Sequence, residues 1–326
     1  MQIFTKIIWI SIQCVIIVKL MRLFILISLT FLSNYSLFSQ CDSVKVMFYN
    51  AENLFDFKND TLKNDNEFLP SSKKNWNRDK FVKKINRIIK VIAANNFPDI
   101  IGLCEIENDS VLYKLTSHFQ VKHKKYKVIH FESADRRGID CALIYSSLQW
   151  DLNSLKPNSV KLNGRPTRDI LSTTLVNKTD TLALFVNHWP SRYGGKNKSK
   201  PKRISASFVL LHVMDSVKRN FPTRKIIAMG DFNDEPKDSS LLLLNAFSNQ
   251  SSTFKGTIRY RGKWQIFDQF ICSNNFKYYS KAFKASFLLE QDKTYGGLKP
   301  FRTYYGPMYH NGFSDHLPIV LTFCAP

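Results

Sequence analysis

The sequence predicts an α/β layered sandwich with a mixed sheet. Short apolar runs of strand length recur between residues 44 and 324, and several are apolar at nearly every position, as expected for strands covered on both faces. Two longer segments, 78–95 and 203–218, place apolar residues at helical spacing instead. Because strands covered on both faces need further layers above and below them, we expect helices and sheets to stack.

The elements follow one another without a linker, a repeat or a low-complexity segment, so residues 43–326 are expected to form one domain. The first predicted helix carries an apolar stripe of Phe81, Val82, Ile85, Ile88, Ile89 and Ile92, and the second carries Ile204, Phe208, Leu211 and Met214 on one side. Strands are expected at 44–50, 99–105, 140–146, 170–176, 182–188, 225–231, 265–273 and 318–324.

Residues 1–40 are interpreted as an export segment, either a signal peptide or an N-terminal membrane segment. The runs "IIWISIQCVIIV" and "MRLFILISLTFLSNYSLFSQ" follow basic residues and contain no acid. The second run begins at Met21 and approaches the length that a bilayer requires, although Ser and Asn interrupt it. Cys41 follows directly, which leaves a lipid-modified cysteine as an alternative. We therefore expect an exported protein that is extracellular, periplasmic or on the cell surface.

Charge and cysteine content narrow the classes of partner and metal. The chain has a formal net charge of +21, and its first 40 residues contain three basic residues and no acid, which leaves +18 for the remainder. This surplus favours a polyanionic partner such as nucleic acid or an anionic membrane surface. The cysteines lack zinc-site spacing, and Cys104, Cys141 and Cys272 lie in apolar runs where buried free thiols are expected.

Polar side chains gather where the predicted strands end. Asn50, Glu105, His188 and Asp231 each stand at the C-terminal end of an apolar run. Asp315 instead precedes the last run, so its strand must be antiparallel if it joins the others. Carboxylate and amide oxygens without a thiol suit a hard divalent cation, Mg²⁺ first, with Mn²⁺ or Ca²⁺ as alternatives.

A histidine and a buried acid are expected to pair at the same edge. His316 and Asp315 are neighbours in extended chain and should point to opposite faces. Asp268 lies in the aromatic run "IFDQF", where an unpaired carboxylate would be costly, so it is the better partner for His316. The pair is interpreted as a general base with a fixed tautomer and a raised pKa. A structural Asp bonded to backbone amides is the alternative.

Seven motifs occur in order over about residues 44–323: "YNAENLF", "DIIGLCEIEN", "RGIDCALIY", "VNHWPSR", "GDFNDEP", "FDQFICS" and "SDHLPIVL". Together they resemble the endonuclease/exonuclease/phosphatase superfamily, the DNase I-like fold. Single motifs are weak, but "GDFN" followed by "SDHLP", with an upstream strand ending in Glu, is specific. The resemblance implies a four-layer αββα sandwich with two mixed sheets and a magnesium-dependent phosphodiester hydrolase.

The resemblance also implies roles for individual residues. Asn50 and Glu105 would bind the metal, with Asp315 in or beside its shell. Asp231 would orient or deprotonate the attacking water, and Asn233 would hold the scissile phosphate. His316 paired with Asp268 would be the other catalytic centre. The groups that face the phosphate would be His188, Asn187 and Arg168.

The substrate stays open between classes. A secreted, strongly basic member of this family most simply cleaves DNA or RNA, and the stretch 191–203, "SRYGGKNKSKPKR", is a candidate loop for phosphate contacts. A sphingomyelinase-like enzyme for lipids, or a phosphodiesterase or phosphatase for small phosphoesters, is the alternative. A non-catalytic binding protein on the same fold is the third hypothesis. No stable protein partner is implied, and the N-terminus could tether the protein to a membrane.

Overall fold

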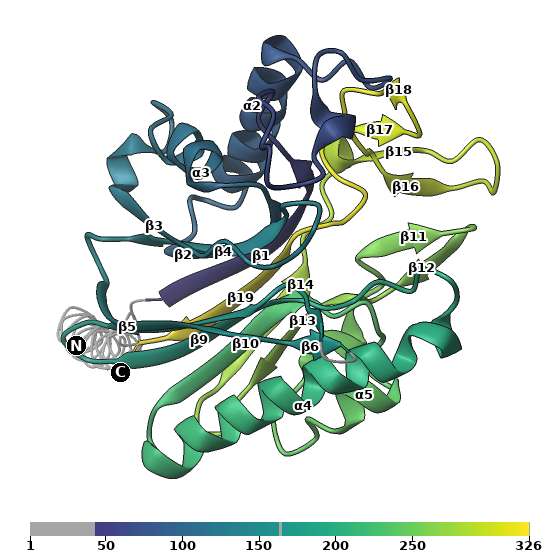
Figure 1. Cartoon of the computed structure of the whole chain (residues 1–326). Coiled ribbons are helices and arrows are strands. Elements are labelled where there is room, and N and C mark those ends of the chain that lie inside the picture. The colour runs from purple at the N-terminus through teal and green to yellow at the C-terminus, as the bar shows by residue number, and fades with distance from the viewer. Residues whose placement is uncertain (1–42, 163–164, 326) are drawn as a thin grey trace, which may run out of the picture. The chain divides into compact units, whose positions relative to one another are not determined.

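The computed structural model describes residues 43–162 and 165–325. Two β-sheets pack against each other, and helices cover their outer faces (Figure 1). The predicted signal peptide or membrane segment at 1–40 lies outside the described residues. Within the described ranges, none of the helices combines the length and the apolar character that crossing a membrane requires.

Both sheets are mixed, because β1 pairs with β2 and β9 with β10 in parallel while the other neighbours are antiparallel. The six-stranded sheet has the order β14 (Tyr278–Ala282), β19 (Ile319–Cys324), β1 (Ser43–Leu54), β2 (Ile100–Ile106), β4 (Asp140–Ser146) and β3 (Tyr126–His130). The five-stranded sheet has the order β13 (Asp268–Cys272), β10 (Lys225–Asp231), β9 (Thr181–His188), β8 (Ile170–Val176) and β5 (Asp151–Asn158).

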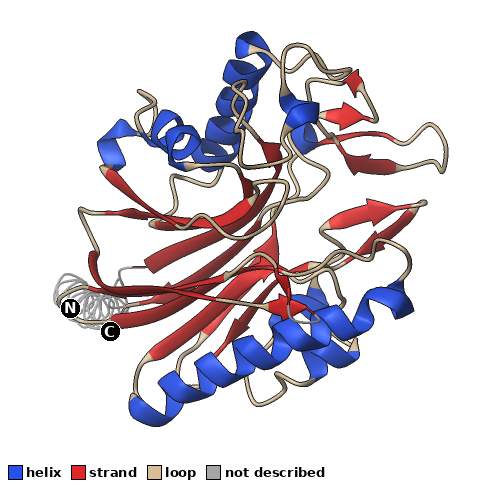
Figure 2. Cartoon of the chain, in the orientation of Figure 1, coloured by secondary structure: helices blue, strands red, loops and turns tan. Residues whose placement is uncertain are grey.

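The remaining elements are helices and small hairpins (Figure 2). The α-helices are α2 (Arg78–Ala94), α3 (Asp109–Thr116), α4 (Lys196–Asn220) and α5 (Ser239–Leu242). Four 3-10 turns are η1 (Asn66–Phe68), η2 (Lys122–Lys124), η3 (Gln250–Thr253) and η4 (Ser286–Leu288). The two-stranded pairs are β6 (Lys161–Leu162) with β7 (Arg165–Pro166), β11 (Ile258–Tyr260) with β12 (Lys263–Gln265), β15 (Leu289–Gln291) with β16 (Leu298–Pro300), and β17 (Tyr304–Tyr305) with β18 (Met308–Tyr309).

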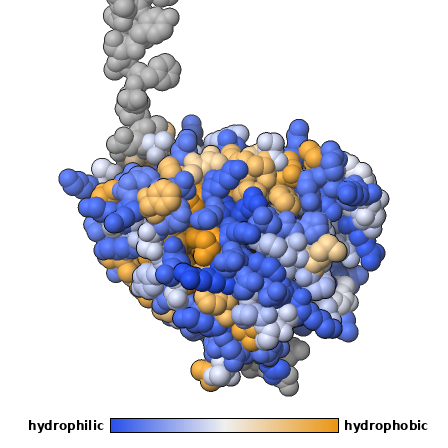
Figure 3. Space-filling view, turned by 90° about the horizontal axis from the view of Figure 1, so that it is seen from above, coloured by the Kyte–Doolittle hydropathy of each residue, from blue (hydrophilic) through white to orange (hydrophobic). Residues whose placement is uncertain are grey.

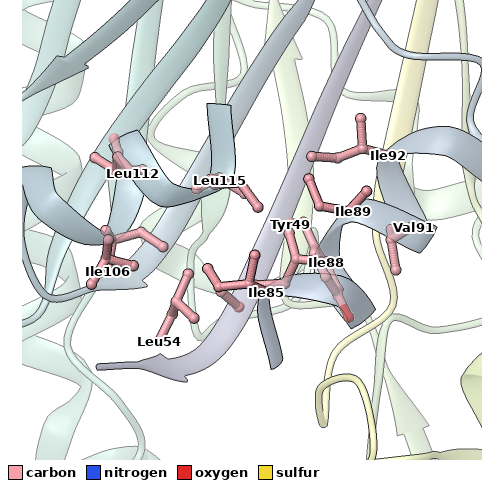
Figure 4. Packing of buried hydrophobic residues seen from close by; sticks show 14 of the residues in the cluster. Tyr49, Leu54, Ile85, Ile88, Ile89, Val91, Ile92, Ile106, Leu112 and Leu115 are labelled. Carbon is pink, nitrogen blue, oxygen red and sulfur yellow. The ribbon is translucent and has the colours of Figure 1, made fainter. Parts of the chain in front are cut away.

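Side chains along the central strands point alternately to the two faces of each sheet, and the buried apolar ones form three layers. In β1, Met47 and Tyr49 face α2 and α3, whereas Val46 and Phe48 face the second sheet. Figure 4 shows the outer layer, in which Ile85 and Ile88 of α2 pack near Tyr49. A third layer joins β9 and β10 to α4. The predicted four-layer αββα order with two mixed sheets is therefore confirmed.

The structure corrects two element boundaries. The strand expected at 265–273 is broken, because β12 ends at Gln265 and β13 starts at Asp268. The helix expected at 203–218 begins at Lys196, with Pro201 in its second turn. Met214 of the predicted stripe is buried, but Phe208 is 55% exposed, and Ala206 and Leu210 complete the buried face instead. The face that packs on the sheet is therefore turned from the predicted one, and it includes the small residues Ala206 and Ser207.

One face of the described part of the chain is mainly polar. Figure 3 shows one face on which hydrophilic residues predominate and apolar residues form small separate patches. The cysteines Cys104, Cys141 and Cys272 are free and buried, as expected. Such a surface, with its net positive charge, is compatible with a polyanionic partner.

Glu107, which directly follows β2, gives a prediction of how the stability of the fold depends on pH. Burial raises the pKa of Glu107 to about 8, and the carboxylates of Asp56, Asp65 and Asp60 add to the effect. Because the folded state then holds a proton that the unfolded state has lost, this carboxyl stabilises the fold less as pH rises from about 4.5 to about 8. We expect Glu107→Gln to gain stability relative to the parent across this window, measured by urea unfolding at several pH values. A constant difference between the two proteins would contradict the assignment.

Candidate active site

Seven of the predicted side chains meet at one edge of the two packed sheets. Asn50 lies in β1, where the pairing with β2 begins to shift in register, and Glu105 lies near the end of β2. In the second sheet Asp231 is paired with His188 on one side and with Asp268 on the other. His316 stands just before β19 and bonds to Asp268. The remaining member is Asn233, two residues beyond Asp231. The strand-end pattern in the sequence thus corresponds to a real cluster.

Two carboxylates converge on the Asn50 amide. Asn50 Nδ2 donates to Asp231 Oδ2 at 3.1 Å and to Glu105 Oε1 at 3.4 Å, and so it links the two sheets. The Asn50 side-chain oxygen accepts the backbone N–H of Glu52 at 2.9 Å. The second oxygen of Glu105 accepts the N–H of Asn53 at 2.8 Å. Both carboxylates are therefore held in place by neighbouring amides.

The backbone at these residues is unusual. Glu105 has φ 60° where the β2–β4 register shifts, and Asn53 and Asn233 have φ 54° and 52°. Left-handed backbone is uncommon for Glu and costs free energy that the surrounding structure must supply. The bulge turns the Glu105 side chain into the cluster. Strain of this kind is often found where a side chain is positioned for function.

His316 is held as predicted. Its Nδ1 lies 2.7 Å from Asp268 Oδ2, and both side chains are buried. Burial alone lowers the pKa of His316, but the carboxylates of Asp268 and Asp231 outweigh it and raise this pKa well above the ordinary value. The two carboxylates therefore favour the charged form of the imidazole. The raised pKa agrees with the expectation for the pair, and the general-base role of His316 stays a prediction; a charged imidazolium would instead stabilise anionic oxygen or donate a proton.

The pKa values of Asp231 and His188 are shifted in opposite directions. Burial raises the pKa of Asp231 to about 7, and the carboxylates of Asp268 and Glu105 raise it further against the lowering effect of His316. Burial, with the nearby Arg168, lowers the pKa of His188 well below its ordinary value, so this imidazole is neutral. His188 Nε2 lies 3.8 Å from both Glu105 Oε1 and Asp231 Oδ2. Of these groups, Asp231 is suited to accept a proton near pH 7.

Two residues expected to bind substrate are structural instead. The buried Arg168 guanidinium donates to the His188 and Trp189 carbonyls at 3.0 Å each and to Asp135 at 2.7 Å, so it positions the His188 loop rather than a phosphate. Asn187 is fully buried, and its amide bonds the Met229 carbonyl and the Trp189 indole. A side chain in place of Gly230 would collide with Asn187 at 2.4 Å, which explains the glycine of "GDFN".

Asn233 and Asp315 are only partly as expected. The Asn233 N–H donates to Asp231 Oδ1 at 3.0 Å, and its side-chain amide donates to the Trp189 carbonyl at 3.0 Å. One amide N–H is therefore already committed to protein. Asp315 pairs with Arg302 at 3.1 Å and is about a quarter exposed, so it lies at the rim rather than among the other carboxylates.

The basic stretch 191–203 is not the expected loop. Most of it forms the first turns of α4, and three of its cations are paired with acids that follow "GDFN". Arg203 and Arg192 bond the buried Asp234 carboxylate at 2.7 and 3.1 Å, and Lys196 bonds Asp238 at 2.6 Å. Asp234 therefore anchors α4 to the segment that follows β10. The charge available for phosphate contacts is smaller than the sequence suggests.

A second layer of charged groups was not predicted. Glu52, in "YNAENLF", accepts the Thr303 N–H at 2.6 Å and pairs with Arg302 at 3.2 Å. Lys84 of α2 donates to the Thr303 hydroxyl and to the Phe313 carbonyl, both at 2.6 Å. Burial lowers the pKa of Lys84 to about 8. The sequence signal for this layer was Lys84 within the apolar stripe of α2, and a lysine in that position is also typical of the solvated edge of a helix.

A cavity of about 180 Å³ opens beside this layer. Its lining combines charged groups with aromatic rings: Glu52, Asn53, Phe68, Lys74, Trp76, Arg302, Thr303, Tyr304 and Gly306. Glu52 and Asn53 bond directly to Asn50 and Glu105, so the cavity adjoins the carboxylate cluster. A substrate reacting at the cluster could place a neighbouring group here.

The donor set fits a divalent cation. Glu105 and Asp231 place two carboxylates around the same Asn50 amide, and a hard cation would neutralise their charge. Glu105 would be the principal ligand, and the Asn50 oxygen could join it after leaving the Glu52 N–H. Asp315 would contribute only from the rim. The residues therefore suit the predicted magnesium, although no particular ion is identified by them.

The chain is similar to a known protein family in sequence and to solved structures in fold. Residues 45–324 match the model of the Endonuclease/Exonuclease/phosphatase family. No curated protein gives a significant sequence match. Solved structures with the same fold include the human Nocturnin catalytic domain with bound sulfate, at 16% identity and TM-score 0.57 over 87% of this chain and 95% of that one.

Two further structures are similar over nearly their whole length. Truncated TDP2 from Caenorhabditis elegans is 16% identical, with TM-score 0.57 over 87% of this chain and 98% of that one. A mannosyl-6-phosphatase from Bacteroides thetaiotaomicron is 14% identical, with TM-score 0.58 over 85% and 98%. At these identities the likeness establishes the shared fold alone.

Proposed function

Because the chain belongs to the endonuclease/exonuclease/phosphatase family, whose members are phosphoesterase hydrolases, we propose that it is a divalent-metal-dependent phosphodiesterase that cleaves nucleic acid. The observation that carries the proposal is the convergence of Asn50, Glu105, Asp231 and the His316–Asp268 pair at one edge. These groups are the ones that an attack of water on a phosphoester requires.

The chemistry follows from the charges of the side chains. Asp231, with a pKa near 7, takes the proton of the attacking water. The His316 imidazolium lies 3.7 Å from Asp231 and offers positive charge to the phosphate oxygens as negative charge grows on them. Asp268 keeps this imidazole charged and oriented. A bound divalent cation would supply Lewis-acid polarisation of the phosphoryl group.

Nucleic acid is proposed as the substrate because the chain is strongly basic. Among the cations of the 191–203 stretch, Lys198, Lys200 and Lys202 are exposed near the start of α4. Phosphate contacts would come from these lysines rather than from Arg192 or Arg203. Such contacts neutralise backbone charge without reading the base sequence.

A small phosphoester is the second candidate, and the cavity beside Glu52 favours it. A carboxylate, an arginine and aromatic rings in one cavity suit a compact polar group such as a sugar. The similar Bacteroides structure is named a mannosyl-6-phosphatase. Lipid hydrolysis of the sphingomyelinase kind has no comparable feature among the described residues.

A panel of substrates separates the candidates. We expect purified protein with Mg²⁺ to cleave plasmid DNA or RNA and a chromogenic phosphodiester, and to lose this activity in EDTA and recover it when Mg²⁺ or Mn²⁺ is returned. Sugar phosphates and sphingomyelin serve as the competing substrates. Preferred cleavage of a sugar phosphate would favour the second candidate, activity that resists EDTA would argue against a metal role, and no phosphoester cleavage would favour a binding protein.

We also propose that the protein is exported, on the basis of the apolar, acid-free residues 1–40. An extracytoplasmic location would place the enzyme among nucleic acid or phosphoesters outside the cell. Cell fractionation with an antibody to the domain at 43–326 tests this, and recovery in the cytoplasm alone would contradict it.

A further inference from the structure

We propose a second cation site, formed by His130, Glu132 and Asp140, that takes a divalent transition metal, Zn²⁺ first. These residues lie at the end of β3, in the following loop and at the start of β4. One ligand atom from each lies within 4.8 Å of the others. His130 and Asp140 belong to β3 and β4, which follow β2 in the order of the same sheet (Figure 1).

Two buried atoms at the centre of the group have no hydrogen-bond partner. They are His130 Nε2 and Asp140 Oδ2, and the side chains that carry them are 2% and 1% exposed. The atoms are 3.7 Å apart, which is too far for a hydrogen bond. Two ligands about 2.1 Å from a tetrahedral zinc ion stand about 3.4 Å apart, so a small shift would let one cation contact both.

The outer contacts orient both ligands as metal sites require. His130 Nδ1 lies 3.0 Å from Asp109 Oδ1, the arrangement in which a carboxylate fixes the ring tautomer and leaves Nε2 free to bind. Asp140 Oδ1 accepts the Ser133 N–H at 3.1 Å, which turns Oδ2 toward the histidine. Both contacts are made without using the two orphan atoms.

Glu132 completes the donor set from the open side. Its side chain is 54% exposed, so it can move toward the buried pair. At present it lies 3.5 Å from the Lys63 ammonium, which a bound cation would replace as its partner. The mixed nitrogen and oxygen donors favour a transition metal over Mg²⁺, which prefers oxygen alone. This chemistry distinguishes the site from the catalytic cluster.

The site would stabilise the loop that supports the active site. Residues 131–139 join β3 to β4, and Asp135 in this loop holds Arg168. Arg168 in turn bonds the carbonyl of His188. A cation bridging the base of the loop would therefore restrain the side of the active site that carries His188. The inference does not depend on the proposed substrate.

Metal binding to the full-length protein tests the proposal directly. We expect metal-free protein to bind Zn²⁺ in calorimetry and retain it in elemental analysis, with a rise in melting temperature. Cobalt in place of zinc should give the optical spectrum of nitrogen and oxygen ligands. His130→Gln should remove this binding, and Glu132→Gln should weaken it at least about tenfold, while the matched variant Glu105→Gln retains it.

Three results would overturn the site. They are the absence of tight Zn²⁺ binding, binding unchanged in both His130→Gln and Glu132→Gln, and loss of binding in Glu105→Gln, which would place the ion in the catalytic cluster. If His130→Gln does not fold, the exposed Glu132 and Asp109 decide the matter. Asp109→Asn should then lower the Zn²⁺ affinity by about 10- to 100-fold, and an unchanged affinity would count against the proposal.

Discussion

Replacing His316 with alanine should reduce the turnover of a phosphodiester by about a thousandfold or more. The His316 imidazole lies 3.7 Å from Asp231, and Asp268 holds it in place at 2.7 Å and favours its charged form. Removing it takes away both charge stabilisation and a proton donor, each of which commonly contributes two or more orders of magnitude. Steady-state kinetics on a chromogenic phosphodiester with saturating Mg²⁺ measures the effect.

Two further variants make the His316 result specific. His212 is an exposed histidine on α4, so His212→Ala should leave turnover unchanged. Asp268→Asn should keep the hydrogen bond but remove the charge that raises the pKa of His316, and it should therefore shift the pH profile of the remaining activity to lower pH. Near parental turnover in His316→Ala on every substrate that the parent cleaves would refute the role.

Asp231→Asn should have a loss of similar size for a different reason. The asparagine keeps the shape of the side chain and the bond from the Asn233 N–H, but it cannot accept a proton from water. A general base commonly accounts for about two to four orders of magnitude in rate. We expect the turnover number to fall by about that amount while the Michaelis constant changes little, because the phosphate is bound by other groups.

The rescue of this variant is informative. A more reactive phosphodiester, or a higher pH that supplies hydroxide, should recover part of the lost rate in Asp231→Asn. Asp151 on the exposed edge strand β5 offers the matched control, and Asp151→Asn should behave as the parent does. A large rise in the Michaelis constant with unchanged turnover would show that Asp231 binds substrate and does not act on water.

The sequence predicted the layers and most of the strands because these depend on local apolar patterning. Strands such as β4 and β8 match their predicted bounds, since apolar or β-branched residues fill most of each and polar residues follow directly. The edge strand β5 was missed because its side chains are mostly exposed and follow no apolar run. The start of α4 was missed because lysines and a proline at a helix beginning resemble a loop.

The sequence predicted the site residues that lie at the ends of apolar runs. It did not predict contacts between residues that are distant in the sequence. Asn50, Glu105, Asp231 and His316 follow or precede apolar runs, and the sequence alone brings them together. Arg168 bonds two backbone carbonyls and the Asp135 carboxylate, partners that no sequence pattern indicates. The pKa of His316 is raised by two carboxylates from different strands, and only the folded chain shows that Asp231 acts on it together with Asp268.

The most direct test of a metal-centred phosphodiester hydrolase is a Mn²⁺ titration of metal-free protein, with hydrolysis of a chromogenic phosphodiester as the readout. The parent should be inactive without metal and should reach saturating activity as Mn²⁺ is added. Glu105→Gln, with its carboxylate neutralised at the principal ligand, should require at least about tenfold more Mn²⁺ and remain slower. Equal activity with and without EDTA, or the same Mn²⁺ dependence in both proteins, would contradict the account.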